Sequence, residues 1–84
     1  MITKKISINI PNQAEARPVA MLVQVASQFQ SHINIEQENR IVNAKSIMGM
    51  MTLGLTPGKE VVVSAEGEDE QSAIDKIETF LSGQ

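Results

Sequence analysis

The run Glu60-Val61-Val62-Val63-Ser64-Ala65 is the part of the sequence that decides the fold. Its three consecutive valines are β-branched, and such residues favour strands because their side chains pack well on a pleated surface. The run follows Thr56-Pro57-Gly58, a typical turn sequence, and Gly67 ends it. We therefore predict a central strand here, with the other elements arranged around it.

The chain after this strand has the pattern of a helix. Asp69 can cap its N-terminus, and the neighbouring acidic residues suit the positive end of the helix dipole. Apolar residues at helical spacing mark its inner face: Ala73, Ile74, Ile77, Phe80 and Leu81. The acidic run 66–70 lacks the alternating ligand spacing of an EF-hand. We interpret it as the start of a helix and not as a calcium site.

Three short segments before the central strand also have strand patterns. Residues 32–36 alternate polar and apolar, and the polar segment 36–39 makes a turn into 40–43, which predicts a hairpin. Residues 6–10 alternate in the same way, and Pro11 closes that strand. The first strand and the hairpin therefore each have one buried face.

A helix is predicted between the first strand and the hairpin. Pro18 fits the first turn of a helix, where its missing N–H has no partner to lose. Arg17 and Gln24 point away from the core, and Met21 lies on the outer side. The apolar residues that line the inner face are Val19, Leu22, Val23, Ala26 and Phe29.

A second, short helix lies between the hairpin and the central strand. Ser46 stands before it and Gly54 after it, the residue types that start and stop helices. Two apolar sets lie on neighbouring arcs: Met50 and Leu53 form one, and Ile47, Met48 and Met51 form the other. So short a helix cannot bury both sets, which predicts an exposed apolar docking surface around the Ser46 hydroxyl. The alternative is a capping serine on a fully buried helix.

The predicted order of elements is βαββαβα. Strands that alternate apolar and polar residues need cover on only one face. We therefore expect an α+β fold with a mainly antiparallel sheet and helices packed on a single side. The 84 residues, of which 42% are apolar, suffice for one modest core, so we expect a single domain over 1–84.

Composition excludes several classes of protein. The absence of cysteine excludes disulfides and a thiolate zinc site. The apolar runs are too short to span a bilayer and the N-terminus lacks a signal block, so we expect a cytosolic protein with no membrane partner. A net charge of −3, with Phe29 and Phe80 as the only aromatic residues, argues against direct binding of nucleic acid.

Signatures of enzymes are also missing. His32 is the only histidine and lies at an outward position of a predicted strand, without a second histidine to form a metal site. The glycines form neither a Walker loop nor a dinucleotide fingerprint. We expect no catalytic activity, no cofactor and no metal ion.

Two segments carry a resemblance to a known family. They are Glu15-Ala16-Arg17-Pro18 and Val42-Asn43-Ala44-Lys45-Ser46-Ile47-Met48-Gly49-Met50-Met51. Over essentially the whole chain, the sequence resembles the HPr family of the bacterial phosphotransferase system. The resemblance implies an HPr-like open-faced β-sandwich, in which a four-stranded antiparallel sheet has three helices on one face. The second segment is similar to the regulatory serine site of HPr proteins from low-GC Gram-positive bacteria.

The resemblance also implies a modification and two partners. In that family the serine that matches Ser46 is phosphorylated and dephosphorylated by HPr kinase/phosphorylase. The phosphorylated protein is then a corepressor of the transcription regulator CcpA. The contact residues implied for this chain are Arg17, Ala20 and Gln24 on the first helix, and Ile47, Met48 and Met51 on the second.

The sequence departs from the family pattern at the phosphohistidine position. Phosphocarrier HPr proteins have a histidine directly before Ala-Arg-Pro, and this chain has Glu15, with Gln13 where a glycine is usual. A carboxylate forms only a far more labile acyl phosphate, so the resemblance favours the branch of the family that acts in carbon catabolite repression. The alternative is a phosphocarrier that uses Glu15 or His32, and a third hypothesis is that Glu15 mimics a phosphohistidine. Pro11 also lies where a hinge would allow strand exchange between two chains.

Overall fold

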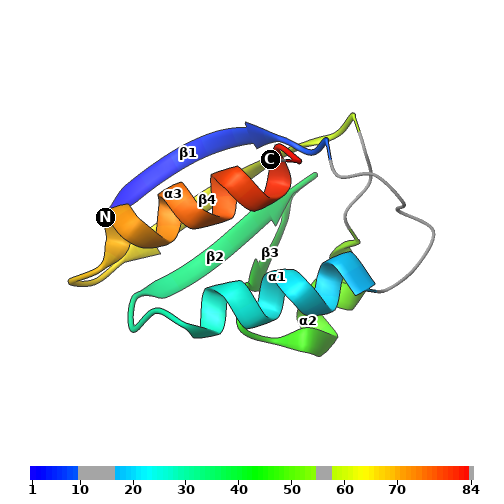
Figure 1. Cartoon of the computed structure of the whole chain (residues 1–84). Helices are drawn as coiled ribbons and strands as arrows, with labels where there is room; N and C mark the ends of the chain where they lie inside the picture. The colour runs from blue at the N-terminus through cyan, green and yellow to red at the C-terminus, as the bar shows by residue number, and fades with distance from the viewer. Residues whose placement is uncertain (10–16, 55–57, 84) are drawn as a thin grey trace.

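The computed structural model describes residues 1–9, 17–54 and 58–83, and the side chains of all of these except 17 and 18. Four strands and three helices follow one another in the predicted βαββαβα order (Figure 1). Their bounds are β1 Ile2–Ser7, α1 Arg17–Ser27, β2 His32–Gln37, β3 Arg40–Asn43, α2 Ile47–Leu53, β4 Glu60–Glu66 and α3 Glu70–Leu81.

The strands form one antiparallel sheet in the order β1-β4-β2-β3. β4 therefore lies inside the sheet, and the prediction of a central strand at the valine run is confirmed. Its Val63 pairs with Lys4 of β1 on one side and with Ile35 of β2 on the other. Ile35 in turn pairs with Val42 across the hairpin.

One face of the sheet carries the core. The buried residues on this face alternate with exposed residues in β2 and with half-buried residues in β4, so the predicted one-sided burial is confirmed. The buried apolar residues of the strands and of the segment after β1 are Ile6, Ile8, Ile33, Ile35, Val61, Val63 and Ala65. The helices contribute Val19, Leu22, Ala26, Met50, Ala73, Ile74, Ile77 and Leu81. Both predicted inner faces of the long helices thus pack on the sheet.

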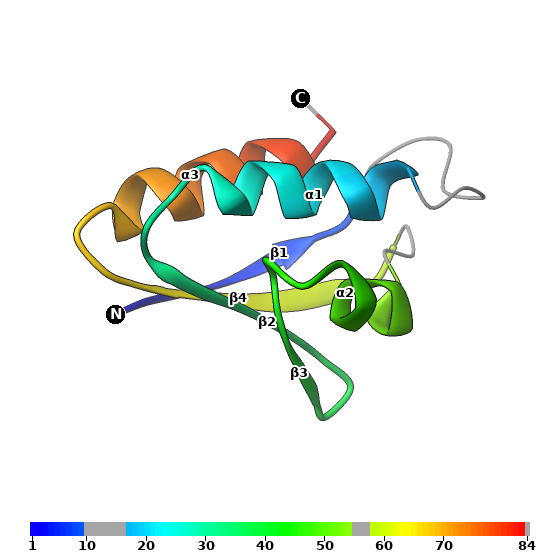
Figure 2. The ribbon, with the colours of Figure 1, turned by 90° about the horizontal axis from the view of Figure 1, so that it is seen from below.

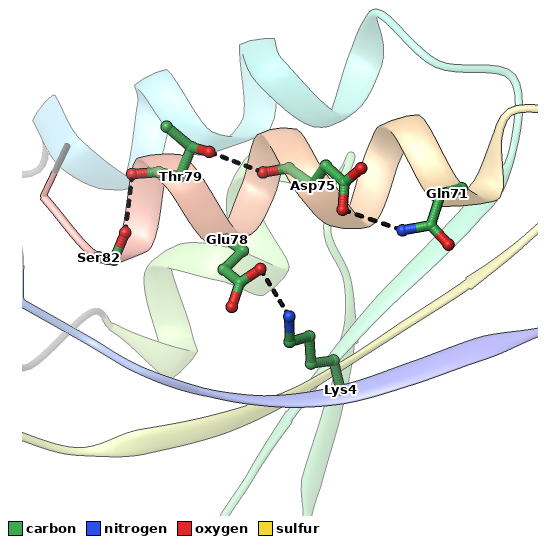
Figure 3. A network of polar contacts seen from close by, with 6 residues as sticks. All are labelled: Lys4, Gln71, Asp75, Glu78, Thr79 and Ser82. Atoms are coloured by element: carbon green, nitrogen blue, oxygen red, sulfur yellow. Dashed lines mark hydrogen bonds and ion pairs between the residues drawn. The ribbon is translucent and has the colours of Figure 1, made fainter.

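The helices differ in what they cover. Figure 2 shows α1 and α3 on the same side of the sheet, and α3 contacts β1 and β4. On α3, Glu78 accepts a hydrogen bond from the Lys4 ammonium of β1, with 2.7 Å between Nζ and Oε1 (Figure 3). The short α2 follows β3 at the edge of the sheet and contacts both β3 and α1. Helices α1 and α2 are therefore neighbours.

The first strand differs from its predicted position. β1 begins at Ile2 and ends at Ser7, whereas the alternation indicated a strand over residues 6–10. Ile6 and Ile8 are buried as predicted, while Ile10 and Pro11 lie outside the described residues. The strand starts at Ile2 because its residues pair with β4 from Ala65 back to Glu60. Lys4, on the same face as Ile6, is exposed and extends to Glu78 of α3.

The turn of the hairpin is shorter than the polar segment suggested. β2 extends through Gln37, whose side chain is buried, and Glu38 and Asn39 alone form the turn. Both turn residues have positive φ, 51° and 68°, as a tight hairpin of twisted strands requires. The polar residue Gln37 therefore belongs to β2, although the sequence pattern predicted that this strand ends before it.

The prediction that the Asp69 side chain caps α3 is wrong. Asp69 stands at the N-cap position, but its carboxylate accepts hydrogen bonds from Gln30 and Ser31, in the turn between α1 and β2. Glu70 does act at the helix start, where its Oε1 accepts from the Gly67 N–H at 3.1 Å. The acidic run therefore joins two turns as well as starting a helix.

Candidate functional site at the start of α2

The segment between β3 and α2 is fixed to the sheet. The Ala44 N–H donates to the Ile33 carbonyl at 2.9 Å, and the Ala44 side chain is fully buried. The Asn43 side chain accepts from the Lys45 N–H at 2.8 Å, and the Asn43 carbonyl accepts from the Ser46 N–H at 3.0 Å. These bonds form a turn that delivers Ser46 to the start of α2.

Ser46 is the N-cap residue of α2, as predicted. Its backbone is extended, with φ −100° and ψ 112°, and its Oγ accepts from the Gly49 N–H at 3.2 Å. Ser46 is half-buried, so part of the residue is in contact with solvent. At the other end Gly54 has a φ of 76°, and its N–H donates to the Met50 carbonyl. The predicted serine start and glycine stop are both confirmed.

Three apolar side chains on α2 face solvent. Ile47 is 41% exposed, Met48 76% and Met51 56%, whereas Met50 on the opposite side is completely buried. Leu53 packs against the core as a half-buried residue. The alternative of a fully buried helix is therefore wrong. We call the exposed set of Ile47, Met48 and Met51 the α2 patch.

Helix α1 lies beside α2 and carries the other sequence-predicted contact residues. Arg17 is its first residue, Ala20 is half-buried and Gln24 is exposed. Met21, which the periodicity put on the outer side, is indeed exposed. Because α1 and α2 are in contact, the two halves of the predicted contact set belong to neighbouring helices. Glu15 lies outside the described residues.

Two cations near the site have partners that the sequence pattern did not reveal. Lys45 donates from Nζ to the Phe29 carbonyl at 2.7 Å, just after the last residue of α1. Arg40 donates to the Thr52 carbonyl at 3.1 Å, at the end of α2. Cations are favourable at helix C-termini because the exposed carbonyls carry partial negative charge. Lys45, which directly precedes Ser46, is therefore directed to the neighbouring helix.

The two helices of the site contain no acidic residue. The sequences of Arg17–Ser27 and Ile47–Leu53 have neither aspartate nor glutamate, and the turn before α2 adds only Lys45 as a charged residue. Seven of the ten acidic residues of the chain lie in β4, α3 and the turn between them, and Glu36 and Glu38 lie in the β2–β3 hairpin. Most of the negative charge is thus carried by elements other than the two helices of the site.

The remaining candidate residues do not join this site. His32 is exposed at the start of β2, on the open face of the sheet, next to a cavity of about 30 Å³ that Met1 and Ser64 also line. A groove of about 230 Å³ between α1 and α3 is lined by Val25, Gln28, Lys76, Thr79 and Phe80.

Across residues 1–9, 17–54 and 58–83, no three potential metal ligands gather at one point. None of the helices α1, α2 and α3 in this part of the chain is long and apolar enough to cross a membrane.

Comparison with known proteins identifies the family. The family model described as the PTS HPr component phosphorylation site matches residues 2–83. The chain is 41% identical over 81 residues to the HPr-like protein Crh of Bacillus subtilis (strain 168), a match that covers 96% of this chain and 95% of that protein.

Solved structures agree with this match. An HPr protein from Thermoanaerobacter tengcongensis is similar with a TM-score of 0.86 and 44% identity, covering 100% of this chain and 99% of the other. The crystal structure of Crh from Bacillus subtilis, described as a dimer with a swapped domain, gives a TM-score of 0.74 at 41% identity, covering 96% and 93%.

The chain therefore belongs to the HPr family of the phosphotransferase system. Within this family it is related to the catabolite-repression protein Crh. HPr-like proteins of this kind are in general not enzymes. The expectations of family and of an open-faced sandwich, drawn from the sequence, are both confirmed.

Proposed function

We propose that this protein is a non-enzymatic regulator of carbon catabolite repression in the cytoplasm. In this proposal HPr kinase/phosphorylase phosphorylates Ser46, and the phosphorylated protein is a corepressor of a CcpA-type transcription regulator. The observation that carries it is the half-buried N-cap residue Ser46 beside the solvent-exposed α2 patch on one short helix. The relationship to Crh supports the same function.

A phosphate on Ser46 changes the surface more than the fold. It adds nearly two negative charges. The charge falls at the start of α2, where the N–H groups and the helix dipole favour it, so the helix is kept. A dianion then stands beside Ile47, Met48 and Met51. An arginine of the partner can pair with the phosphate while the α2 patch is buried against apolar residues of that partner.

Helix α1 supplies the second half of the proposed contact surface. Ala20 and Gln24 lie on the helix that contacts α2, and Arg17 begins that helix. An arginine guanidinium suits anions because it is always charged and donates in a fork. Lys45 is less suited to this role, since its ammonium is bound to the Phe29 carbonyl.

Labelling with HPr kinase/phosphorylase and ATP tests the proposal. Mass spectrometry is expected to find one phosphate, on the peptide that contains Ser46, and none in Ser46→Ala. The matched control is Ser64→Ala on the open face of the sheet, which should be labelled like the original protein. The phosphorylated protein should then bind a CcpA-type regulator, and the unmodified protein should bind far more weakly. Failure of the kinase to label Ser46 would overturn the proposal.

The alternative function is that of a phosphocarrier of the sugar phosphotransferase system. It is favoured by the family model, which describes a phosphorylation site, and by the likeness to an HPr structure. It is disfavoured by Glu15, because the relay uses an imidazole nitrogen. Labelled phosphoenolpyruvate with enzyme I separates the two: we expect no stable transfer to this protein. Stable transfer that Glu15→Gln or His32→Gln abolishes would establish the carrier instead.

A further inference from the structure

Sulfur chemistry in this chain is confined to methionine. The sequence has five methionines, no cysteine, no tryptophan and no tyrosine. Thioethers are therefore its most readily oxidised side chains, with no thiol to react first. Three of the five methionines lie within α2, and they are not equivalent. Met48 and Met51 are exposed in the α2 patch, while Met50 between them is sealed in the core.

We propose that Met48 and Met51 form a peroxide-sensitive modification site that cancels docking of the α2 patch. The inference rests on the proposed function, since the α2 patch is the docking surface there. Hydrogen peroxide is the oxidant. A lone pair of the thioether sulfur attacks one peroxide oxygen, and the O–O bond breaks as the S–O bond forms. The second oxygen leaves as a water molecule, which carries both peroxide hydrogens. The sulfur is oxidised to a sulfoxide and the peroxide is reduced.

The change acts on the surface and spares the fold. A sulfoxide is a polar group, and burying it against an apolar partner without a hydrogen bond is unfavourable. Oxidation thus removes two of the three side chains that make the α2 patch apolar. Met50 is out of reach of peroxide and continues to hold α2 against the core. The Ser46 cap on the Gly49 N–H involves no sulfur and is unaffected.

This chemistry makes the site reversible and independent of the kinase. Methionine sulfoxide reductases return each sulfoxide epimer to the thioether. Two signals would therefore meet on one seven-residue helix. The phosphate on Ser46 would promote docking, and the sulfoxides on Met48 and Met51 would oppose it even while the phosphate is present.

The first experiment maps oxidation in the folded protein. Unphosphorylated protein is treated with dilute hydrogen peroxide, and peptide mass spectrometry follows each methionine over time. Met48 and Met51 are expected to oxidise about tenfold or more faster than Met50, in line with their exposure. Met1, exposed at the far end of β1, gives the rate of an unhindered thioether. Equal rates at Met50 and Met48 would overturn the inference. Sulfoxide reductase should restore the original mass.

The second experiment measures binding of the Ser46-phosphorylated protein to a CcpA-type regulator before and after peroxide. Oxidation should weaken binding by about tenfold or more, and the thermal midpoint of unfolding should stay close to that of untreated protein. In Met48→Leu/Met51→Leu, a volume-conserving change, peroxide should have no effect, although Met1, Met21 and Met50 remain. Undiminished binding after oxidation overturns this inference alone. Absence of binding by the untreated phosphoprotein overturns the proposed function as well.

Discussion

The Asp69 carboxylate accepts a hydrogen bond from the hydroxyl of Ser31, 38 residues earlier in the chain. The same carboxylate accepts from the backbone N–H groups of Gln30 at 2.9 Å and of Ser31 at 3.0 Å. These bonds join the turn after α1 to the turn before α3. The Ser31 hydroxyl, followed by the Gln30 N–H, lowers the pKa of Asp69 below its ordinary value, because both donate to the charged form.

Acid is therefore expected to weaken this joint. A carboxyl group whose pKa is lower in the folded state stabilises the fold at pH values above its unfolded-state pKa. This contribution is lost as the pH falls through the folded-state pKa. We expect the free energy of unfolding to decrease as the pH is lowered below about 4. The decrease should be smaller in Asp69→Asn. Ser31→Ala, which removes one donor, should be intermediate. Urea unfolding at several pH values measures this. An acid dependence in Asp69→Asn equal to that of the original protein would contradict the assignment.

A side chain at position 67 would collide with this joint. A Cβ on Gly67 would lie 2.6 Å from the Ser31 Oγ and 2.7 Å from the Ser31 Cα, and Gly67 has a φ of 153°. We expect Gly67→Ala to cost about 2 kcal/mol or more, since the backbone of Ser31 must move. Gly58→Ala is the control: its φ is 85°, but no atom lies within 4 Å, so about 1 kcal/mol of backbone strain is expected. Chemical unfolding measures the loss of stability in each variant. Equal losses of stability in the two variants would argue against the collision.

The methionines of α2 should separate stability from docking. Met50→Ala empties a site in the core and should lower the free energy of unfolding by about 2–5 kcal/mol. Met48→Ala changes an exposed side chain and should alter it by no more than about 0.5 kcal/mol. Urea unfolding of the two variants, made on the same helix, gives the comparison. The opposite order would contradict the burial of Met50 and the exposure of Met48.

Replacement of Lys45 tests its contact with α1. Lys45→Met keeps most of the aliphatic stem and removes the ammonium that donates to the Phe29 carbonyl, so we expect a loss of about 1–2 kcal/mol. Lys76→Met, at an exposed position of α3, is the matched control and should change stability little. Protection of the Gly49 N–H from exchange with deuterium should be similar in the two variants, because the Ser46 cap does not use Lys45. Unchanged stability in Lys45→Met would show that this contact does not stabilise the fold.

Local periodicity was sufficient to predict the elements and the exposed set on α2. The alternation in β2, the valine run in β4 and the helical spacing in α1 and α3 are local patterns that a sequence displays directly. The Ser46 and Gly54 caps were also predictable, because cap preferences depend on the residue itself and its neighbours.

Long-range polar contacts account for what the sequence did not reveal. The partner of Asp69 lies 38 residues away, and that of Lys45 lies 16 away on another helix. Such pairs follow no repeat and depend on how the helices are placed on the sheet. Lys4 of β1 likewise has its partner 74 residues away, in Glu78 of α3.

The lack of carboxylates on α1 and α2 determines how strongly a single modification can be sensed. Where a surface is already acidic, one further anion is a small change in an existing field. Here the standing charges of the two helices and the turn before α2 are Arg17 and Lys45. A phosphate, with nearly two negative charges, would therefore offset these two positive charges and place an anion where α1, α2 and the turn have none. A cationic receptor would lose a repulsion and gain an anionic partner, so the composition of the two helices sets the contrast between the two states.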